Sequence, residues 1–187
     1  MIRAFVAVSV PDSVLQRCRE IGDRLRELNL EGQFARTRSI HLTLQFLGNI
    51  AEKKVAPIEK VLQETGGEVL PFSLEIRRLG AFPNLSKPRI LWIGVYPVEI
   101  LSDLQGRLQK RLGPMGFPGQ DRPFHPHLTL VRFKSRRNLS ALIEYVEGKG
   151  ADEQAGVLKV EEVHLYQSIL KPDGAEYRKL VTVKLGG

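Results

Sequence analysis

The sequence contains one cysteine, Cys18, so no disulfide can form within the chain. It has no apolar run near the roughly 18 to 20 residues that a membrane-spanning helix requires. The apolar segment at residues 1–10 is too short for a secretory signal and leads directly into Pro11, so it reads as a first strand. We therefore expect a cytoplasmic protein without a membrane anchor.

Several catalytic signatures are also missing. There is no Gly-x-Ser-x-Gly elbow, no Gly-rich phosphate loop ending in Lys and Ser or Thr, no His-Glu-x-x-His helix and no cysteine pair. Cys18 falls on the apolar stripe of the first expected helix, which favours a buried structural thiol. His125 and His127 could face one way and bind zinc, but no third ligand lies beside them. We predict a protein that needs neither metal nor cofactor.

The composition is that of a soluble globular protein, with 42% hydrophobic and 26% charged residues. A length of 187 residues suits one domain, residues 1–187, built from two small lobes. The net charge of +7 favours polyanionic partners such as nucleic acid. Basic residues cluster beside two sequence motifs: Arg36, Arg38, Arg132, Lys134, Arg136 and Arg137.

Those motifs are two copies of His-Leu-Thr-Leu, at residues 41–44 and 127–130, although the chain has only four histidines. Alternating residues of a strand point to opposite faces, so each His and Thr share one face and both leucines share the other. One such segment would be most simply a half-exposed strand. The identical duplicate instead indicates two strands that each present a His and a Thr to a common cleft.

The remaining pattern predicts strands and helices without a regular βαβ succession, which indicates an α+β fold with antiparallel sheets. Apart from the two motif strands, strands are expected near residues 1–10, 33–37, 72–76, 90–96, 157–170 and 177–185, and helices near residues 12–28, 51–65, 100–112 and 139–147. Two loops rich in Gly and Pro, residues 80–88 and 113–126, and a hairpin turn at residues 171–174 connect them.

A pair of histidines suits phosphodiester cleavage, because one can take a proton from the nucleophile while the other gives a proton to the departing oxygen. Thr43 and Thr129 would hydrogen-bond the nonbridging phosphate oxygens, and Arg132 would offset the phosphate charge. An odd offset from His127 points Arg132 to the opposite face unless the strand bulges, so Arg132 ranks below the others. The residues alone leave open whether His41 or His127 is the acid.

Other aromatic and histidine residues are expected to be structural. We predict that His164 is a strand residue, that His125 shapes the start of the second motif strand and that Trp92 belongs to the core. Phe46 could stack on a base, but the alternation of Leu42 and Leu44 predicts that it packs inside.

These residues resemble the 2H phosphoesterase superfamily, which is named for two His-x-Thr/Ser-x motifs, and within it the RNA 2′,3′-cyclic phosphodiesterases once called bacterial 2′-5′ RNA ligases. The similarity covers nearly the whole chain. The segments that carry it are residues 3–7, 41–48, 126–132, 165–168 and 172–177. Gln45 departs from the pattern, since relatives often carry Lys there, and Val131 stands where relatives often have a small residue.

The resemblance implies a bilobal α+β fold with outer helices, in which two pseudo-symmetric lobes each bring one motif to a central cleft. It also implies metal-free hydrolysis of RNA 2′,3′-cyclic phosphate ends to 2′-phosphomonoesters, with His41 as proton donor and His127 as proton acceptor, and with Thr43, Thr129 and Arg132 binding the phosphate. The expected partner is RNA or a related nucleotide, bound by a monomer. Two alternatives stay open: 2′-5′ RNA ligation in the same site, and RNA binding without catalysis.

Overall fold

The computed structural model describes residues 1–119, 123–171 and 174–186, and in these residues nine strands form two antiparallel sheets. The strands are β1 (Ile2–Val8), β2 (Gly32–Phe34), β3 (Leu42–Ile50), β4 (Phe72–Phe82), β5 (Ile90–Tyr96), β6 (His127–Phe133), β7 (Gln154–Val160), β8 (Glu162–Lys171) and β9 (Gly174–Lys184). The first sheet has the order β3-β1-β8-β9, and the second has the order β2-β6-β5-β4-β7. The predicted α+β class with two antiparallel sheets is confirmed.

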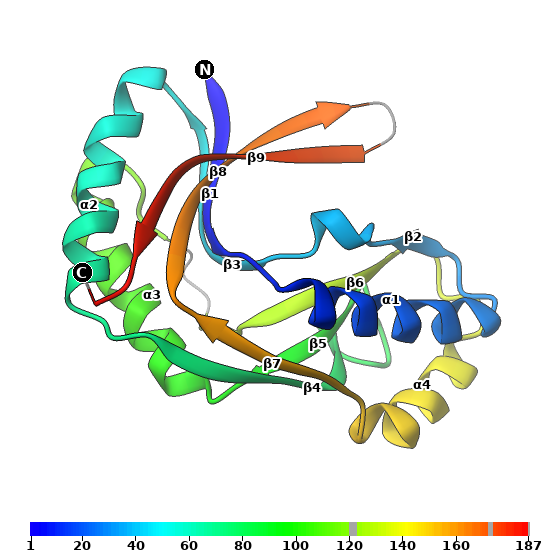
Figure 1. The fold of residues 1–187 in the computed structure, drawn as a ribbon. Coiled ribbons are helices and arrows are strands. Elements are labelled where there is room, and N and C mark those ends of the chain that lie inside the picture. The colour runs from blue at the N-terminus through cyan, green and yellow to red at the C-terminus, as the bar shows by residue number, and fades with distance from the viewer. Residues whose placement is uncertain (120–122, 172–173, 187) are drawn as a thin grey trace.

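The described residues include four α-helices, which lie on the outer faces of the sheets (Figure 1). They are α1 (Asp12–Glu27), α2 (Val55–Gly67), α3 (Val98–Leu112) and α4 (Leu139–Glu147). Helix α2 packs on β8 and β9 of the first sheet and contacts α3, whereas α1 packs on β6 and β7 of the second sheet. Each helix buries one stripe of apolar residues, as its spacing predicts.

A single apolar cluster runs between the helices and both sheets. Val6, Leu42, Leu128 and Leu165 are fully buried in it, and Leu42 and Leu128 belong to the His-Leu-Thr-Leu motifs. These motif leucines therefore anchor the two strands from behind, which fixes the direction in which the neighbouring His and Thr side chains point.

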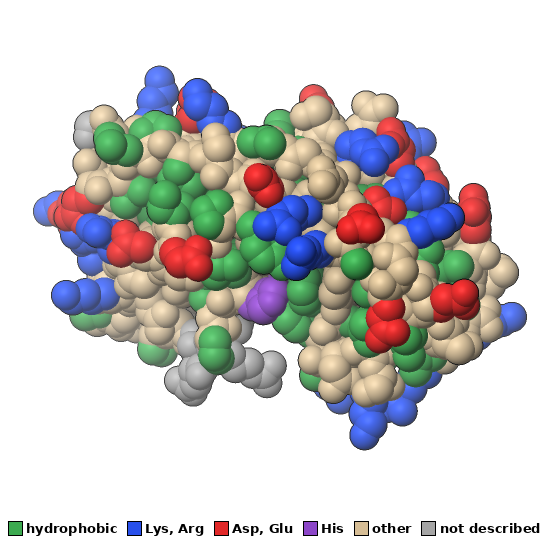
Figure 2. Space-filling model, turned by 90° about the horizontal axis from the view of Figure 1, so that it is seen from below, with side chains coloured by type: hydrophobic (Ala, Val, Ile, Leu, Met, Phe, Trp, Pro, Cys, Tyr) green, Lys and Arg blue, Asp and Glu red, His purple; other side chains and the backbone are tan. Residues whose placement is uncertain are grey.

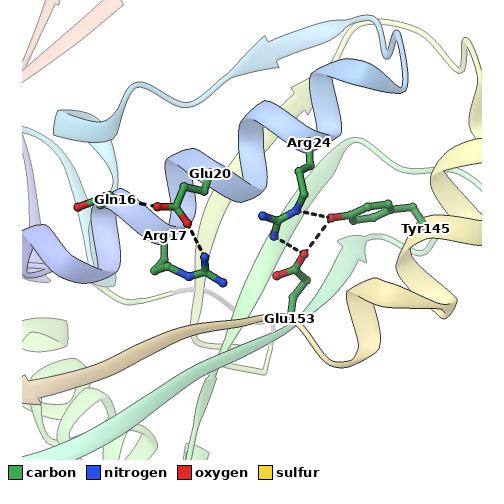
Figure 3. A network of polar contacts seen from close by, with 6 residues as sticks. All are labelled: Gln16, Arg17, Glu20, Arg24, Tyr145 and Glu153. Atoms are coloured by element: carbon green, nitrogen blue, oxygen red, sulfur yellow. Dashed lines mark hydrogen bonds and ion pairs between the residues drawn. The ribbon is translucent and has the colours of Figure 1, made fainter.

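A polar network ties α1 to α4 and to the start of β7 (Figure 3). The Arg24 guanidinium donates to the Tyr145 hydroxyl at 3.2 Å and to the Glu153 carboxylate, and the Tyr145 hydroxyl donates to the same carboxylate at 2.9 Å. Because Glu153 is buried, these two donors offset the cost of removing its charge from water.

Two strand predictions were wrong in extent. Strand β4 continues through Phe82, because Arg78 adopts a positive φ of 62° and forms a bulge that interrupts the alternation without ending the strand. Gly80 fits inside this strand because the Trp92 ring covers it and occupies the space that a Cβ would need. The expected strand at residues 157–170 is divided at Glu161, so that β7 joins the second sheet and β8 joins the first.

The other connections agree more closely with the pattern. The strand expected near residues 33–37 is β2, followed by a 3₁₀ turn at Thr37–Ser39, and the helix expected from residue 51 begins with a 3₁₀ turn at Glu52–Lys54. The hairpin is confirmed by the antiparallel pairing of β8 with β9, whose last pair is Lys171 and Gly174. Its central residues, 172 and 173, lie outside the described residues. No described helix is long and apolar enough to cross a membrane.

Candidate active site

The first motif stands at the edge of the first sheet. His41 directly precedes β3, and its imidazole packs against both the Phe5 and the Tyr177 rings, with centroid distances of 4.6 and 4.7 Å. A hydrogen bond links the imidazole to the backbone of Ser39, two residues earlier. The ring is therefore fixed from the side by aromatic contacts and from behind by the chain that leads into the strand.

The second motif starts β6, between β2 and β5 in the other sheet. His127 Nδ1 lies 2.7 Å from the His125 carbonyl oxygen, which can only accept a hydrogen bond, so the proton of the neutral ring is on Nδ1. Nε2 then carries the free lone pair of a proton acceptor. The Phe82 ring packs edge-on against this imidazole at 4.9 Å.

Both motif strands contain a β-bulge directly after the threonine. In β3, Thr43 pairs with Ala7 and Gln45 pairs with Val6, which leaves Leu44 as the extra residue. Leu44 and Gln45 are consequently both buried, and the alternation of faces is reversed beyond them. Phe46 emerges on the His41 side, 55% exposed and 6.0 Å from the Phe5 ring. The prediction that Phe46 packs inside was therefore wrong, because it assumed uninterrupted alternation.

Strand β6 has the corresponding bulge. Thr129 pairs with Trp92 and Val131 pairs with Leu91, so Leu130 is the extra residue, and Leu130 and Val131 are both buried. This places the exposed side chain of Arg132 on the face that carries Thr129. The bulge that the sequence argument needed for Arg132 is thus present in the structure.

Burial and the positive charge of Arg132 lower the pKa values of both motif histidines. Burial is the main reason that the pKa of His41 falls to about 4; the bond to the Ser39 backbone opposes this shift, and the positive charges of Arg132 and His127 contribute to it. Burial also lowers the pKa of His127, aided by the charges of His125 and Arg132. Because Coulomb interactions weaken with distance, the effect of one arginine on both imidazoles indicates that the half-sites adjoin. Both rings are neutral at pH 7 in the free protein.

Thr43 and Thr129 are half-buried on the same faces as their histidines. Their hydroxyl groups can donate to an anion lying between the motif strands, which contact each other. Figure 2 shows a notch between the two halves of the molecule with a histidine side chain at its inner end. All five predicted site residues therefore lie on faces turned toward one junction of the sheets.

The prediction from sequence missed most of the aromatic lining. The first half-site contains Phe5, Tyr166 and Tyr177, with Phe5 and Tyr166 stacked at 5.3 Å, and a hydrogen bond of 2.8 Å joins the Tyr166 and Ser9 hydroxyls. In the second half-site, Trp92 is buried as predicted, but its indole packs on His125 at a centroid distance of 4.7 Å. The cross-strand pairing of Trp92 with Thr129 is a long-range contact, which a single sequence does not encode as a pattern.

Three other predicted positions can be placed. His164 is a buried residue of β8, as expected, and its Nδ1 lies 3.0 Å from the Thr182 hydroxyl. Cys18 is buried in α1, where burial raises the pKa of its thiol to about 12. Gln45 donates to the Phe117 carbonyl at 2.8 Å, so its side chain serves packing next to the site. In the described part of the chain, no group of three or more His, Cys, Asp or Glu residues could hold a metal ion.

A family model described as the 2′-5′ RNA ligase superfamily matches residues 10–171. The RNA 2′,3′-cyclic phosphodiesterase of Archaeoglobus fulgidus is 37% identical over 181 residues, which cover 96% of this chain and 98% of that protein. The protein of the same name from Methanothermobacter thermautotrophicus is 35% identical over 184 residues, covering 98% of this chain and 99% of its own. These matches confirm the resemblance predicted from the motifs.

Solved structures with the same fold include the protein TT0787 of Thermus thermophilus, with a TM-score of 0.82, 27% identity and coverage of 99% of this chain and 98% of that one. The structure of E. coli LigT complexed with 3′-AMP has a TM-score of 0.72 and 25% identity, and the match covers 100% of this chain and 99% of LigT. The second of these proteins binds a nucleotide.

Proposed function

Because the chain belongs to the 2′-5′ RNA ligase superfamily, we propose that it is a hydrolase that opens RNA 2′,3′-cyclic phosphate ends to 2′-phosphomonoesters without a metal ion. The observation that carries the proposal is the pairing of two histidines, each bonded to the backbone two residues earlier, beside one shared arginine. The names of the relatives from Archaeoglobus and Methanothermobacter support the same activity.

In the proposed reaction, water attacks the phosphorus while His127 takes its proton through the free Nε2. The bond from phosphorus to O3′ breaks, and His41 gives its proton to the departing O3′. A new P–O bond to the water oxygen replaces the one that is lost, so the phosphate stays on O2′. The Nδ1–H bond to the His125 carbonyl holds His127 in the tautomer that this role requires.

The proton donor must be charged when the leaving group departs, although burial keeps His41 neutral at pH 7 in the free protein. The negative charge of a bound cyclic phosphate favours the imidazolium form and raises the pKa of His41. Substrate binding would therefore protonate His41. In the free protein, both imidazoles stay neutral, so no imidazolium ion lies beside the positive charge of Arg132.

Thr43, Thr129 and Arg132 are proposed to bind the nonbridging phosphate oxygens. Two hydroxyl donors and one guanidinium would stabilise the charge that builds up on these oxygens as water attacks. The aromatic side chains beside the histidines offer flat surfaces for the ribose and the base, in keeping with the nucleotide bound by LigT.

The test is to incubate the purified protein, in the presence of EDTA, with a short RNA ending in 2′,3′-cyclic phosphate. Chromatography that separates 2′- from 3′-phosphate ends should show only the 2′-phosphate. A second RNA with a 5′-hydroxyl in the same reaction detects ligation as a longer product. A 3′-phosphate product, a requirement for metal or no turnover at all would contradict the proposal.

A further inference from the structure

A basic hollow of about 540 Å³ lies beside the segment that leads into His41. Four exposed arginines line it: Arg19 and Arg26 from α1, and Arg36 and Arg38 from the segment between β2 and β3. Asp23 is the one acidic side chain among the described residues of its lining. The volume falls in the range that proteins use for small molecules, and it can hold about one nucleotide.

Two positive charges of this hollow, those of Arg19 and Arg38, have no acidic partner among the described residues. The Asp23 carboxylate is already paired with Arg26 at 2.6 Å. Among the residues that the structure describes, no carboxylate forms an ion pair with the guanidinium groups of Arg19 or Arg38. Like charges held around a concave surface raise the local potential, and an anion that enters the hollow lowers it.

The backbone holds two of these arginines in a fixed place. The Arg36 carbonyl accepts a hydrogen bond of 2.8 Å from the Ser39 amide, which closes the turn that carries Arg38. The Ala35 amide donates to the Leu130 carbonyl of β6 at 2.7 Å, while the other end of the segment continues into His41. The hollow is therefore attached directly to both motif strands.

An aromatic ring completes the lining. The Arg26 guanidinium lies 4.5 Å from the centroid of the Phe34 ring. Surfaces that bind single-stranded nucleic acid combine cations that follow the phosphates with flat rings that accept bases. This hollow offers the cations on the segment that continues into His41, and Phe34 is a half-buried ring of its lining that Arg26 covers.

We propose that this hollow binds backbone phosphates of the RNA strand on the 5′ side of the cyclic phosphate end. The inference rests on the proposed function and adds a second contact with the substrate, outside the catalytic pair. A single nucleoside 2′,3′-cyclic phosphate occupies the histidine site alone, whereas an RNA of about ten nucleotides reaches both places. Long RNA should thus be the better substrate because of Arg19 and Arg38.

The experiment compares the wild type with the double variant Arg19→Gln/Arg38→Gln on those two substrates. For the ten-nucleotide RNA, kcat/KM should fall about tenfold, and the slope of log kcat/KM against log salt should flatten by roughly 0.7 for each lost phosphate contact. For the mononucleotide, kcat/KM should change less than twofold. The charge-retaining variant Arg19→Lys/Arg38→Lys should stay close to the wild type on both.

The matched control is Lys53→Gln/Lys60→Gln, which removes two exposed positive charges near and within α2, on the other side of the fold (Figure 1). It should leave the preference for long RNA intact. An equal loss in this control would show that only net charge matters, and an equal loss on the mononucleotide would show damage to the catalytic site. Either result, or an unchanged long-RNA rate in the arginine variant, would overturn the inference.

A binding measurement separates this inference from the proposed reaction. Fluorescence anisotropy with a labelled ten-nucleotide RNA ending in 2′-phosphate needs no turnover. If the wild type hydrolyses neither substrate, the proposed function fails. Weaker RNA binding by Arg19→Gln/Arg38→Gln than by Lys53→Gln/Lys60→Gln would still support binding of RNA in the hollow. Equal affinities of those two variants would refute the hollow even if hydrolysis is confirmed.

Discussion

The two motif strands build their halves of the site in the same way up to the threonine and differ after it. Each histidine bonds to the backbone two residues earlier, and each threonine is followed by a bulged leucine. At the same offset from its histidine, the first half-site then presents Phe46 and the second presents Arg132. The same local backbone geometry thus presents an aromatic ring in the first half-site and a cation in the second.

That difference suggests how the halves divide their tasks. The arginine lowers the pKa of both imidazoles, whereas the exposed Phe46 ring carries no charge and lies beside the Phe5 ring that His41 contacts. We expect the second half-site to govern phosphate charge and the first to contact the nucleoside. The predictions below test this division, starting with the largest expected effect.

Replacing either histidine with alanine should lower kcat by about 10² to 10⁴, because each variant lacks one proton-transfer group. His41→Ala and His127→Ala should retain RNA affinity within a few-fold. Rapid-quench assays and anisotropy measure the two quantities separately. His164→Gln is the control outside both half-sites, and it should keep normal turnover at pH 7. If both alanine variants turned over normally, the two histidines would not be the proton-transfer groups. No turnover by the wild type, with RNA affinity kept in both variants, would instead indicate a binding module.

Arg132→Gln should raise KM about tenfold and should move the pH optimum of kcat/KM upward. Both imidazoles have pKa values lowered by Arg132, so its removal raises both pKa values and shifts the bell-shaped profile toward alkaline pH. Arg132→Lys keeps the charge and should keep the profile. Because the wild-type pKa values lie below 6.5, its kcat/KM should peak on the acidic side of that value. An unshifted pH optimum in Arg132→Gln would show that the charge of Arg132 does not lower the pKa values of the two histidines.

Phe46→Ala should raise KM for a nucleoside 2′,3′-cyclic phosphate by roughly five- to tenfold with little change in kcat, which corresponds to about 1 kcal/mol of lost stacking. Phe46→Tyr keeps the ring and should restore KM. Leu70→Ala removes another exposed apolar side chain far along the chain and serves as the matched control. Steady-state kinetics measure KM for each variant. An unaltered KM in Phe46→Ala would show that Phe46 does not contact the base.

His164→Gln should reduce the acid sensitivity of the fold. Burial lowers the pKa of His164 to about 4, so between pH 6.5 and pH 4 the unfolded chain binds a proton that the folded chain refuses, and stability falls as pH falls. From pH 7 to pH 5 the variant should lose about 2 kcal/mol less unfolding free energy than the wild type. Urea titrations at both pH values measure this, and equal losses would show that His164 is already protonated in the fold.

The sequence predicted those parts of the fold and site that local periodicity determines. The duplicated motif indicated two strands with His and Thr on one face, and helical spacing located all four helices. The bulges at Leu44 and Leu130 escaped prediction, because Leu-Thr-Leu followed by another residue reads as continuous alternation. This single local irregularity explains both the error at Phe46 and the doubt about Arg132.

Long-range pairing accounts for the rest of what sequence could not give. The division of the expected strand at Glu161 depends on which sheet each part joins, and the packing of Trp92 on His125 depends on a cross-strand neighbour. The carbonyl that fixes the tautomer of His127 belongs to the backbone, so no side-chain pattern marks it.

The most direct test of the divided roles uses an RNA end in which sulfur replaces O3′ of the cyclic phosphate. A thiolate leaves without protonation, so the account predicts that His41→Ala cleaves this substrate at nearly the wild-type rate while His127→Ala stays inactive. Rescue of His127→Ala, or failure to rescue His41→Ala, would contradict the assignment of acid and base to these two histidines.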